Sequence, residues 1–129
     1  MASLTQSKNG SILIADDSEA IRVLIKEAIA TSGMKGKIFE ADDGVDAVKL
    51  FKEFRPELVI LDIFMPKADG LQALKAMLVL DKKVKIIITS STDNQKLVSD
   101  GIKLGARGAL LKQFDKQFVL HTIGNVLNQ

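Results

Sequence analysis

Three carboxylates follow short apolar runs of the sequence and could carry chemistry together. Asp16 and Asp17 come at the end of the run 11–16, and Asp62 ends the run 58–62. Carboxylates held close together repel one another, so either one stays protonated or a cation lies among them. Ligand sets made only of oxygen favour hard divalent ions, and Mg²⁺ typically uses one or two carboxylates together with phosphate oxygens.

Two hydroxyls and one ammonium group follow the later apolar runs. Ser90 and Ser91 follow one of them, and Lys112 ends the last. Lysine supplies a positive point charge, and a hydroxyl supplies a hydrogen-bond donor. A cation, an ammonium and a hydroxyl around one carboxylate suit phosphoryl transfer, in which Asp62 would be the nucleophile and would form an acyl phosphate.

Each of these residues also has a plain structural explanation. A lone aspartate at a strand end is usually a turn former or a helix N-cap. We expect Asp17 or Ser18 to cap the first helix, and 42–44 and 69–70 to be caps and turns only. A reactive side chain at nearly every expected strand end favours a shared site over separate caps.

Apolar runs alternate along the chain with segments of helical spacing. The runs, which predict strands, are 11–16, 37–41, 58–62, 84–90 and 108–112. The helical segments are 18–32, 45–54, 70–81, 93–104 and 115–127, with Val45, Ile102, Leu104 and Phe118 among the apolar positions expected to face the core. Strands that alternate with helices predict an α/β fold with a doubly wound parallel sheet. Sites in such sheets lie beyond the carboxyl ends of the strands, where the side chains above are expected.

Length and composition limit the possible classes of protein. The 129 residues suit one domain, which we place at 11–129 after a flexible tail at 1–10. The 18 basic residues nearly balance the 16 acidic ones, and Trp and Tyr are absent, so nucleic-acid binding is not expected. No cysteine, signal peptide or membrane span occurs, which favours a cytoplasmic protein without a membrane partner.

Over residues 11–127 the sequence resembles the receiver domain of two-component response regulators. It is most similar to stand-alone chemotaxis-type regulators, the CheY-like proteins. The motifs that carry the resemblance are the acids at 16–17, the pattern D-x-x-M-P-x-x-D-G at 62–70, Ser90, the turn at 105–106 and Lys112. The resemblance implies a flavodoxin-like (βα)₅ fold with sheet order 2-1-3-4-5.

The resemblance also implies roles for the strand-end residues. Asp62 would be the phosphoacceptor, and Asp17 and Asp62 would bind Mg²⁺ directly. Asp16 would act partly through water. The backbone carbonyl of Phe64 would be a further ligand, and the Phe64 ring would border the site. The remaining contacts, to the phosphoryl oxygens, would come from Ser90 and Lys112.

Two partners are implied by the resemblance, and no enzymatic activity beyond self-phosphorylation and autodephosphorylation is expected. A sensor histidine kinase would donate the phosphoryl group. A separate effector protein would bind the face built from 93–104, 108–112 and 115–127, whose candidate contact residues are Lys96, Lys103, Arg107, Lys116 and Gln117. We expect a monomer or a weak dimer.

Three positions depart from the family pattern. Ala109 stands where an aromatic residue is usual, so switching is expected to rely on the loop after 84–90. Gln113 replaces the usual proline after Lys112, which leaves the geometry of that peptide open. Ser91 replaces a small apolar residue and adds a hydroxyl without an evident purpose.

Three other functions remain alternatives. A magnesium phosphatase with an aspartyl nucleophile would need a substrate-pocket segment, and none is evident. A flavodoxin-type electron carrier would offer hydroxyls and amides in its first loop, where this chain has Asp16 and Asp17. A degenerate receiver would act as an interaction module without phosphorylation; the departures at Ala109 and Gln113 favour it, and the complete set of acids, hydroxyl and lysine disfavours it.

Overall fold

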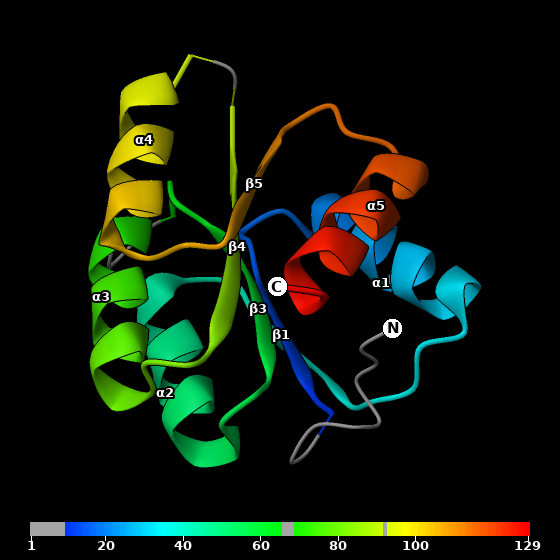
Figure 1. Cartoon of the computed structure of the whole chain (residues 1–129), viewed down its shortest axis with the longest axis horizontal. Helices are drawn as coiled ribbons and strands as arrows, with labels where there is room; N and C mark the ends of the chain where they lie inside the picture. The colour runs from blue at the N-terminus through cyan, green and yellow to red at the C-terminus, as the bar shows by residue number, and fades with distance from the viewer. Residues whose placement is uncertain (1–9, 66–68, 92) are drawn as a thin grey trace.

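The computed structural model describes residues 10–65, 69–91 and 93–129. Five strands alternate with five helices, as predicted (Figure 1). The strands are β1 (Ile12–Ala15), β2 (Ile38–Ala41), β3 (Leu58–Asp62), β4 (Lys85–Ser90) and β5 (Gly108–Leu111). The helices are α1 (Glu19–Ser32), α2 (Gly44–Phe54), α3 (Gly70–Leu80), α4 (Gln95–Leu104) and α5 (Lys116–Leu127).

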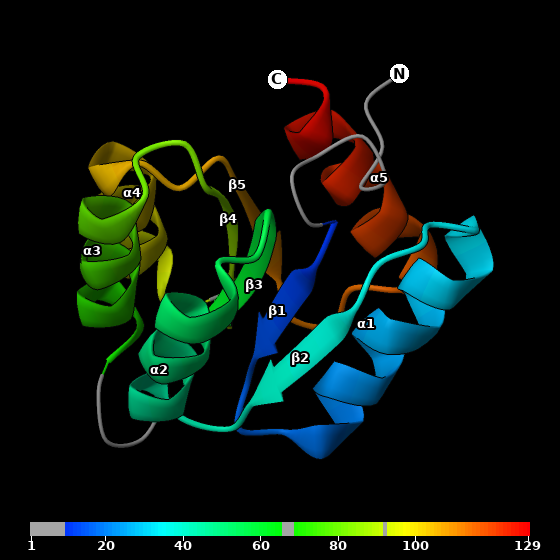
Figure 2. The same ribbon diagram turned by 90° about the horizontal axis from the view of Figure 1, so that it is seen from below.

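The strands form one parallel sheet of order β2-β1-β3-β4-β5, which confirms the predicted topology (Figure 2). Helices α1 and α5 cover one face, and α2, α3 and α4 cover the other (Figure 1). Because side chains alternate along a strand, neighbouring residues join different cores. Ile60 packs on the side of α1 and α5, whereas Val59 and Leu61 pack on the side of α2 and α3. Burial on both faces explains why β1 and β3 are apolar almost throughout.

Side chains cap four of the five helices at their N-termini. Ser18, Asp43, Asp69 and Asp115 each accept a hydrogen bond from a backbone N–H of the first helical turn. The capping predicted for Ser18 and for the acids at 43 and 69 is therefore confirmed. Asn94, the N-cap residue of α4, makes no such side-chain bond to the described part of the chain.

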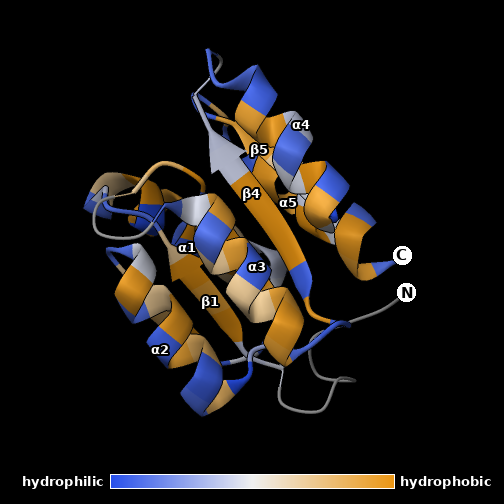
Figure 3. Cartoon of the chain, turned by 90° about the vertical axis from the view of Figure 1, so that its left-hand side faces the viewer, coloured by the Kyte–Doolittle hydropathy of each residue, from blue (hydrophilic) through white to orange (hydrophobic). Residues whose placement is uncertain are grey.

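Four apolar residues predicted to face the core are exposed instead. Val45 is 53% exposed, Phe118 47%, Ile102 44% and Leu104 39%. In α4 the buried residue is Gly101, where an added Cβ would lie 2.7 Å from Ile88 Cδ1. The close approach of Gly101 to the sheet determines which face of α4 is buried, and the apolar side chains of Ile102 and Leu104 are left on the exposed face. In the cartoon of Figure 3, hydrophilic and hydrophobic residues alternate along α2, α3 and α4.

Two expectations concern the ends and the environment of the chain. The predicted tail 1–10 lies outside the described residues except for Gly10, and residues 66–68 of the motif at 62–70 lie outside them as well. Within the described segments, no helix is both long enough and apolar enough to cross a membrane.

Candidate functional site

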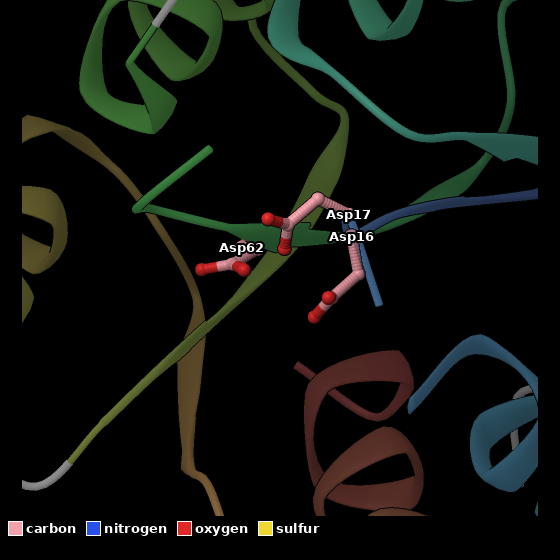
Figure 4. A group of neighbouring side chains, drawn as sticks. All are labelled: Asp16, Asp17 and Asp62. Carbon is pink, nitrogen blue, oxygen red and sulfur yellow. The ribbon is translucent and has the colours of Figure 1, made fainter. Parts of the chain in front are cut away.

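The three predicted carboxylates meet at the carboxyl edge of the sheet. Ala15 of β1 pairs with Leu61 of β3, so the next residues, Asp16 and Asp62, lie at the same level at the carboxyl ends of the two strands. One carboxylate oxygen from each of Asp16, Asp17 and Asp62 lies within 4.8 Å of the others (Figure 4). The parallel register therefore brings Asp62 beside two adjacent acids that precede it by 45 and 46 residues in sequence.

Backbone amides orient the two buried carboxylates. Asp16 and Asp62 are each only 1% exposed, whereas Asp17 is exposed. Asp62 Oδ1 accepts a hydrogen bond from the N–H of Phe64 at 2.9 Å, and Asp16 Oδ1 accepts one from the N–H of Ser18 at 2.8 Å. The side-chain pattern of the sequence did not indicate these two donors, because both are backbone groups in turns.

Lys112 places its ammonium group between the two buried carboxylates. Its Nζ lies 2.9 Å from Asp62 Oδ2 and 3.4 Å from Asp16 Oδ2. The backbone N–H of Lys112 donates to the carbonyl of Ser90 at 2.6 Å, which continues the pairing of β4 with β5. No cis peptide bond occurs among the described residues, and Gln113 adopts the left-handed region with φ 74°. The missing proline therefore does not displace Lys112 from the acids.

The charges of this cluster shift the pKa values of Lys112 and Asp16. Burial by itself would lower the pKa of Lys112, but the hydrogen bond to Asp62 and the charges of both acids leave it above its usual 10.5. Burial raises the pKa of Asp16 from 3.8 to about 6; the Ser18 amide partly opposes this rise, and the charge of Asp62 adds to it. Lys112 is thus fully charged at neutral pH, whereas burial makes the ionised form of Asp16 less favourable than it is in water.

The donor set fits a hard divalent cation. Asp16 Oδ2 is buried and accepts no hydrogen bond from the described residues, although the Lys112 ammonium lies nearby. Together with Asp17 and Asp62 it offers only oxygen ligands, which Mg²⁺ prefers. A second acidic group, Asp42, Asp43 and Asp46, lies at the start of α2, where Asp43 caps the helix as predicted.

The hydroxyl and the aromatic residue predicted at the site are both present, but the hydroxyl bonds to a neighbouring carbonyl and not to Asp62. Ser90 is 1% exposed, and its Oγ donates to the carbonyl of Ser91 at 3.0 Å. Phe64, two residues after Asp62, is 69% exposed. Thr89 pairs in register with Asp62, and its buried Oγ1 has no partner among the described residues. Sequence spacing favoured Ser90 over Thr89 and gave no sign of this second buried hydroxyl.

The raised pKa of Asp16 predicts a pH-dependent effect of Asp16→Asn. The folded protein binds the Asp16 proton more tightly than the unfolded chain does, and this difference stabilises the fold while Asp16 is protonated. The stabilisation is complete below pH 3.8 and is lost as the pH rises through about 6. Without divalent ions, Asp16→Asn should therefore raise the free energy of unfolding by about 3 kcal/mol near pH 7.5 and little near pH 4. Urea unfolding of both proteins across this range measures the difference, and a difference that does not change with pH would contradict the assignment.

Comparisons with known proteins found similar sequences and similar folds. Residues 12–124 match the family model described as "Response regulator receiver domain". The chain is 38% identical over 117 residues to "Chemotaxis protein CheY" of Bacillus subtilis, and the aligned region covers 91% of this chain and 97% of that protein. It is 35% identical over 116 residues to "Chemotaxis protein CheY" of Halobacterium salinarum, covering 90% and 95%. Among solved structures, the REC domain of AraT, a response regulator from Geobacillus stearothermophilus, superposes with a TM-score of 0.83 at 29% identity and covers 92% of each chain.

Proposed function

Because this chain belongs to the response regulator receiver family, we propose that Asp62 accepts a phosphoryl group from a sensor histidine kinase and that this changes the binding of an effector. A receiver domain is a signalling module of two-component systems and not a classical enzyme. One observation chiefly supports Asp62 as the acceptor. Its buried carboxylate lies 2.9 Å from the Lys112 ammonium and within the group of three acids at the sheet edge.

The transfer itself asks little covalent chemistry of the protein. An Asp62 oxygen bonds to phosphorus as the phosphorus–nitrogen bond of the donor histidine breaks, and the imidazole leaves. The Phe64 amide on Oδ1 holds the carboxylate in place for this attack. Lys112 would then turn from the carboxylate to the oxygens of the phosphoryl group, and Ser90 would donate a further hydrogen bond to them.

Asp16, Asp17, Asp62 and the backbone carbonyl of Phe64 would hold Mg²⁺. Bound there, the ion would supply positive charge that offsets the repulsion between carboxylates and incoming phosphoryl oxygens. Asp17 is the exposed member of the set, so its carboxylate is open to an ion that arrives with part of its water shell. Asp16 and Asp62 form the buried side of the site.

The added charge explains how the signal would leave the site. Phosphorylation adds about −1.5 to −2 charges to an edge that is already acidic. We propose that this shifts an equilibrium between two arrangements of the β4–α4 region, which a separate effector reads on the face of α4, β5 and α5. The candidate contact residues on that face, all exposed, are Lys96, Lys103, Arg107, Lys116 and Gln117. We further propose a cytoplasmic protein, monomeric or weakly dimeric, that binds neither nucleic acid nor membrane.

Incubation with acetyl phosphate and Mg²⁺, followed by intact mass measurement, tests the proposed acceptor. We expect one phosphoryl adduct on the wild-type chain and none on Asp62→Asn, because an amide oxygen is a poor nucleophile and forms no stable acyl phosphate. Asp69→Asn is the matched control, since Asp69 is the N-cap residue of α3, a role that asparagine also fills, and this change should leave the adduct unchanged. No adduct on the wild type with any donor would instead support a degenerate receiver that works without phosphorylation.

A further inference from the structure

Ser91 is the centre of the hydrogen bonds in the loop that joins β4 to α4. Its carbonyl accepts from Ser90 Oγ at 3.0 Å and from the backbone N–H of Asn94 at 3.2 Å. Its own hydroxyl donates to Asp93 Oδ1 at 2.6 Å and accepts from Asn94 Nδ2 at 3.0 Å. The bond from Ser91 also lowers the pKa of Asp93, which keeps that carboxylate charged as an acceptor. Position 92 lies outside the described residues.

The first of these bonds determines what the Ser90 hydroxyl can do. A serine hydroxyl carries a single proton to donate, and here that proton goes to the carbonyl of Ser91. Ser90 is 1% exposed, so water does not offer an easy substitute partner. Before Ser90 can donate to a phosphoryl oxygen on Asp62, this bond has to break.

The other bonds tie the start of α4 to the same residue. Four helices have a side-chain N-cap, whereas Asn94, the N-cap residue of α4, makes none with the described residues. Its side-chain amide instead donates to Ser91 Oγ. An asparagine N-cap accepts through its side-chain oxygen, and here the Nδ2–H of the same amide is held by Ser91, so the first turn of α4 has no side-chain cap from Asn94. Ser91 therefore links Ser90, which bonds to its backbone carbonyl, to the beginning of α4, which bonds to its hydroxyl.

We propose that Ser91 is a positioning residue that holds the Ser90 hydroxyl and the start of α4 in their resting arrangement. Phosphorylation of Asp62 has to break this arrangement before Ser90 reaches the new oxygens. The inference rests on the proposed function and goes beyond it, because it assigns a role to the hydroxyl that this chain carries where its family has a small apolar residue. Ser91 thus sets the fraction of molecules that are ready to accept the phosphoryl group.

Ser91→Ala and Ser91→Thr test the hydroxyl directly. Only the threonine variant keeps a donor and acceptor for Asp93 and Asn94. With acetyl phosphate and Mg²⁺, we expect the initial rate of adduct formation to rise roughly 5- to 10-fold in Ser91→Ala, the effect of about one net hydrogen bond on the competent fraction. Ser91→Thr should stay near the wild-type rate. An unchanged or slower rate in Ser91→Ala would overturn the proposal.

A double-mutant cycle separates this network from a general loosening of the loop. Asp93→Ala removes the acceptor of the Ser91 hydroxyl and should also speed adduct formation. If the two residues act through one bond, the double variant should be little faster than either single variant. Rate increases that multiply fully would show two independent effects and would contradict the shared network.

Hydrogen exchange of the unphosphorylated protein gives a readout that does not depend on phosphoryl transfer. In Ser91→Ala the Asn94 side chain is free to cap α4, so the amide of Leu97 in the first turn should exchange several-fold more slowly than in the wild type or Ser91→Thr. If the wild type forms no adduct, the proposed function fails while this readout still decides the role of Ser91. Equal exchange in all three proteins would overturn that role.

Discussion

Replacing Gly70 by alanine is expected to lower the free energy of unfolding by about 3 kcal/mol or more. Gly70 is the buried first residue of α3, and its N–H donates to the carbonyl of Ile63 at 3.1 Å. An added Cβ would lie 2.2 Å from Ile63 Cα, 2.5 Å from the carbonyl oxygen of Asp62 and 2.8 Å from Ile63 C. These are backbone atoms, which cannot turn aside as a side chain can. The start of α3 would have to move away from the end of β3, and the position of Asp62 would change with it.

Gly124→Ala is the matched control for this substitution. Gly124 lies within α5, and an added Cβ there would meet nothing within 4 Å. Alanine at an open helical position should raise the stability by about 0.5–1 kcal/mol. Urea unfolding of both variants measures the two changes. A Gly70→Ala protein as stable as the wild type would show that α3 does not approach the end of β3 in this way.

Lys112→Met should lower the free energy of unfolding of the metal-free protein and raise the affinity of the protein for Mg²⁺. Methionine has a similar length without the charge, so Asp62 and Asp16 would lose the ammonium that lies 2.9 and 3.4 Å from their Oδ2 atoms. Breaking a buried ion pair costs several kcal/mol, and because Lys112 is 28% exposed we expect about 2 kcal/mol. The same ammonium repels a cation among these acids, so its removal should lower the Kd for Mg²⁺ by roughly 10-fold or more.

Titration calorimetry with Mg²⁺ and urea unfolding without divalent ions measure the two effects. Lys116→Met is the control, because Lys116 is also a lysine near the carboxyl end of the sheet but pairs with Glu27 at 3.7 Å and is 46% exposed. Lys116→Met should change neither the Kd for Mg²⁺ nor the free energy of unfolding by much, since exposed ion pairs contribute about 0–1 kcal/mol. Weaker or unchanged Mg²⁺ binding in Lys112→Met would mean that the ion does not share the acids with the ammonium.

The sequence predicted the strands of this fold closely because burial on both faces leaves a simple pattern. The run 58–62 became β3 at the same residues, and 108–112 became β5 with one residue fewer. Helix faces were harder to predict. The periodicity placed Ile102 and Leu104 in the core, yet both are exposed because α4 approaches the sheet through Gly101. A close contact made by a residue without a side chain leaves no trace in an apolar stripe.

For the candidate site, the sequence predicted which side chains meet but not how they are oriented. The alternation of elements predicts a parallel sheet, and the resemblance adds the strand order. In the structure this sheet brings Asp16, Asp62 and Lys112 together. The direction of each carboxylate depends on backbone amides in turns, and the Ser90 hydroxyl bonds to a neighbouring carbonyl. Such choices are set by local geometry of the folded loops and not by residue type or spacing.

Asp62 is the proposed position of the phosphoryl group, and borohydride trapping locates that group most directly. Borohydride reduces an acyl phosphate to an alcohol, so a phosphorylated aspartate becomes homoserine, which peptide mass spectrometry can place in the sequence. After treatment with acetyl phosphate and Mg²⁺, we predict homoserine at position 62. Homoserine at position 16 or 17, or a phosphoryl adduct that leaves position 62 unreduced, would contradict the proposed acceptor.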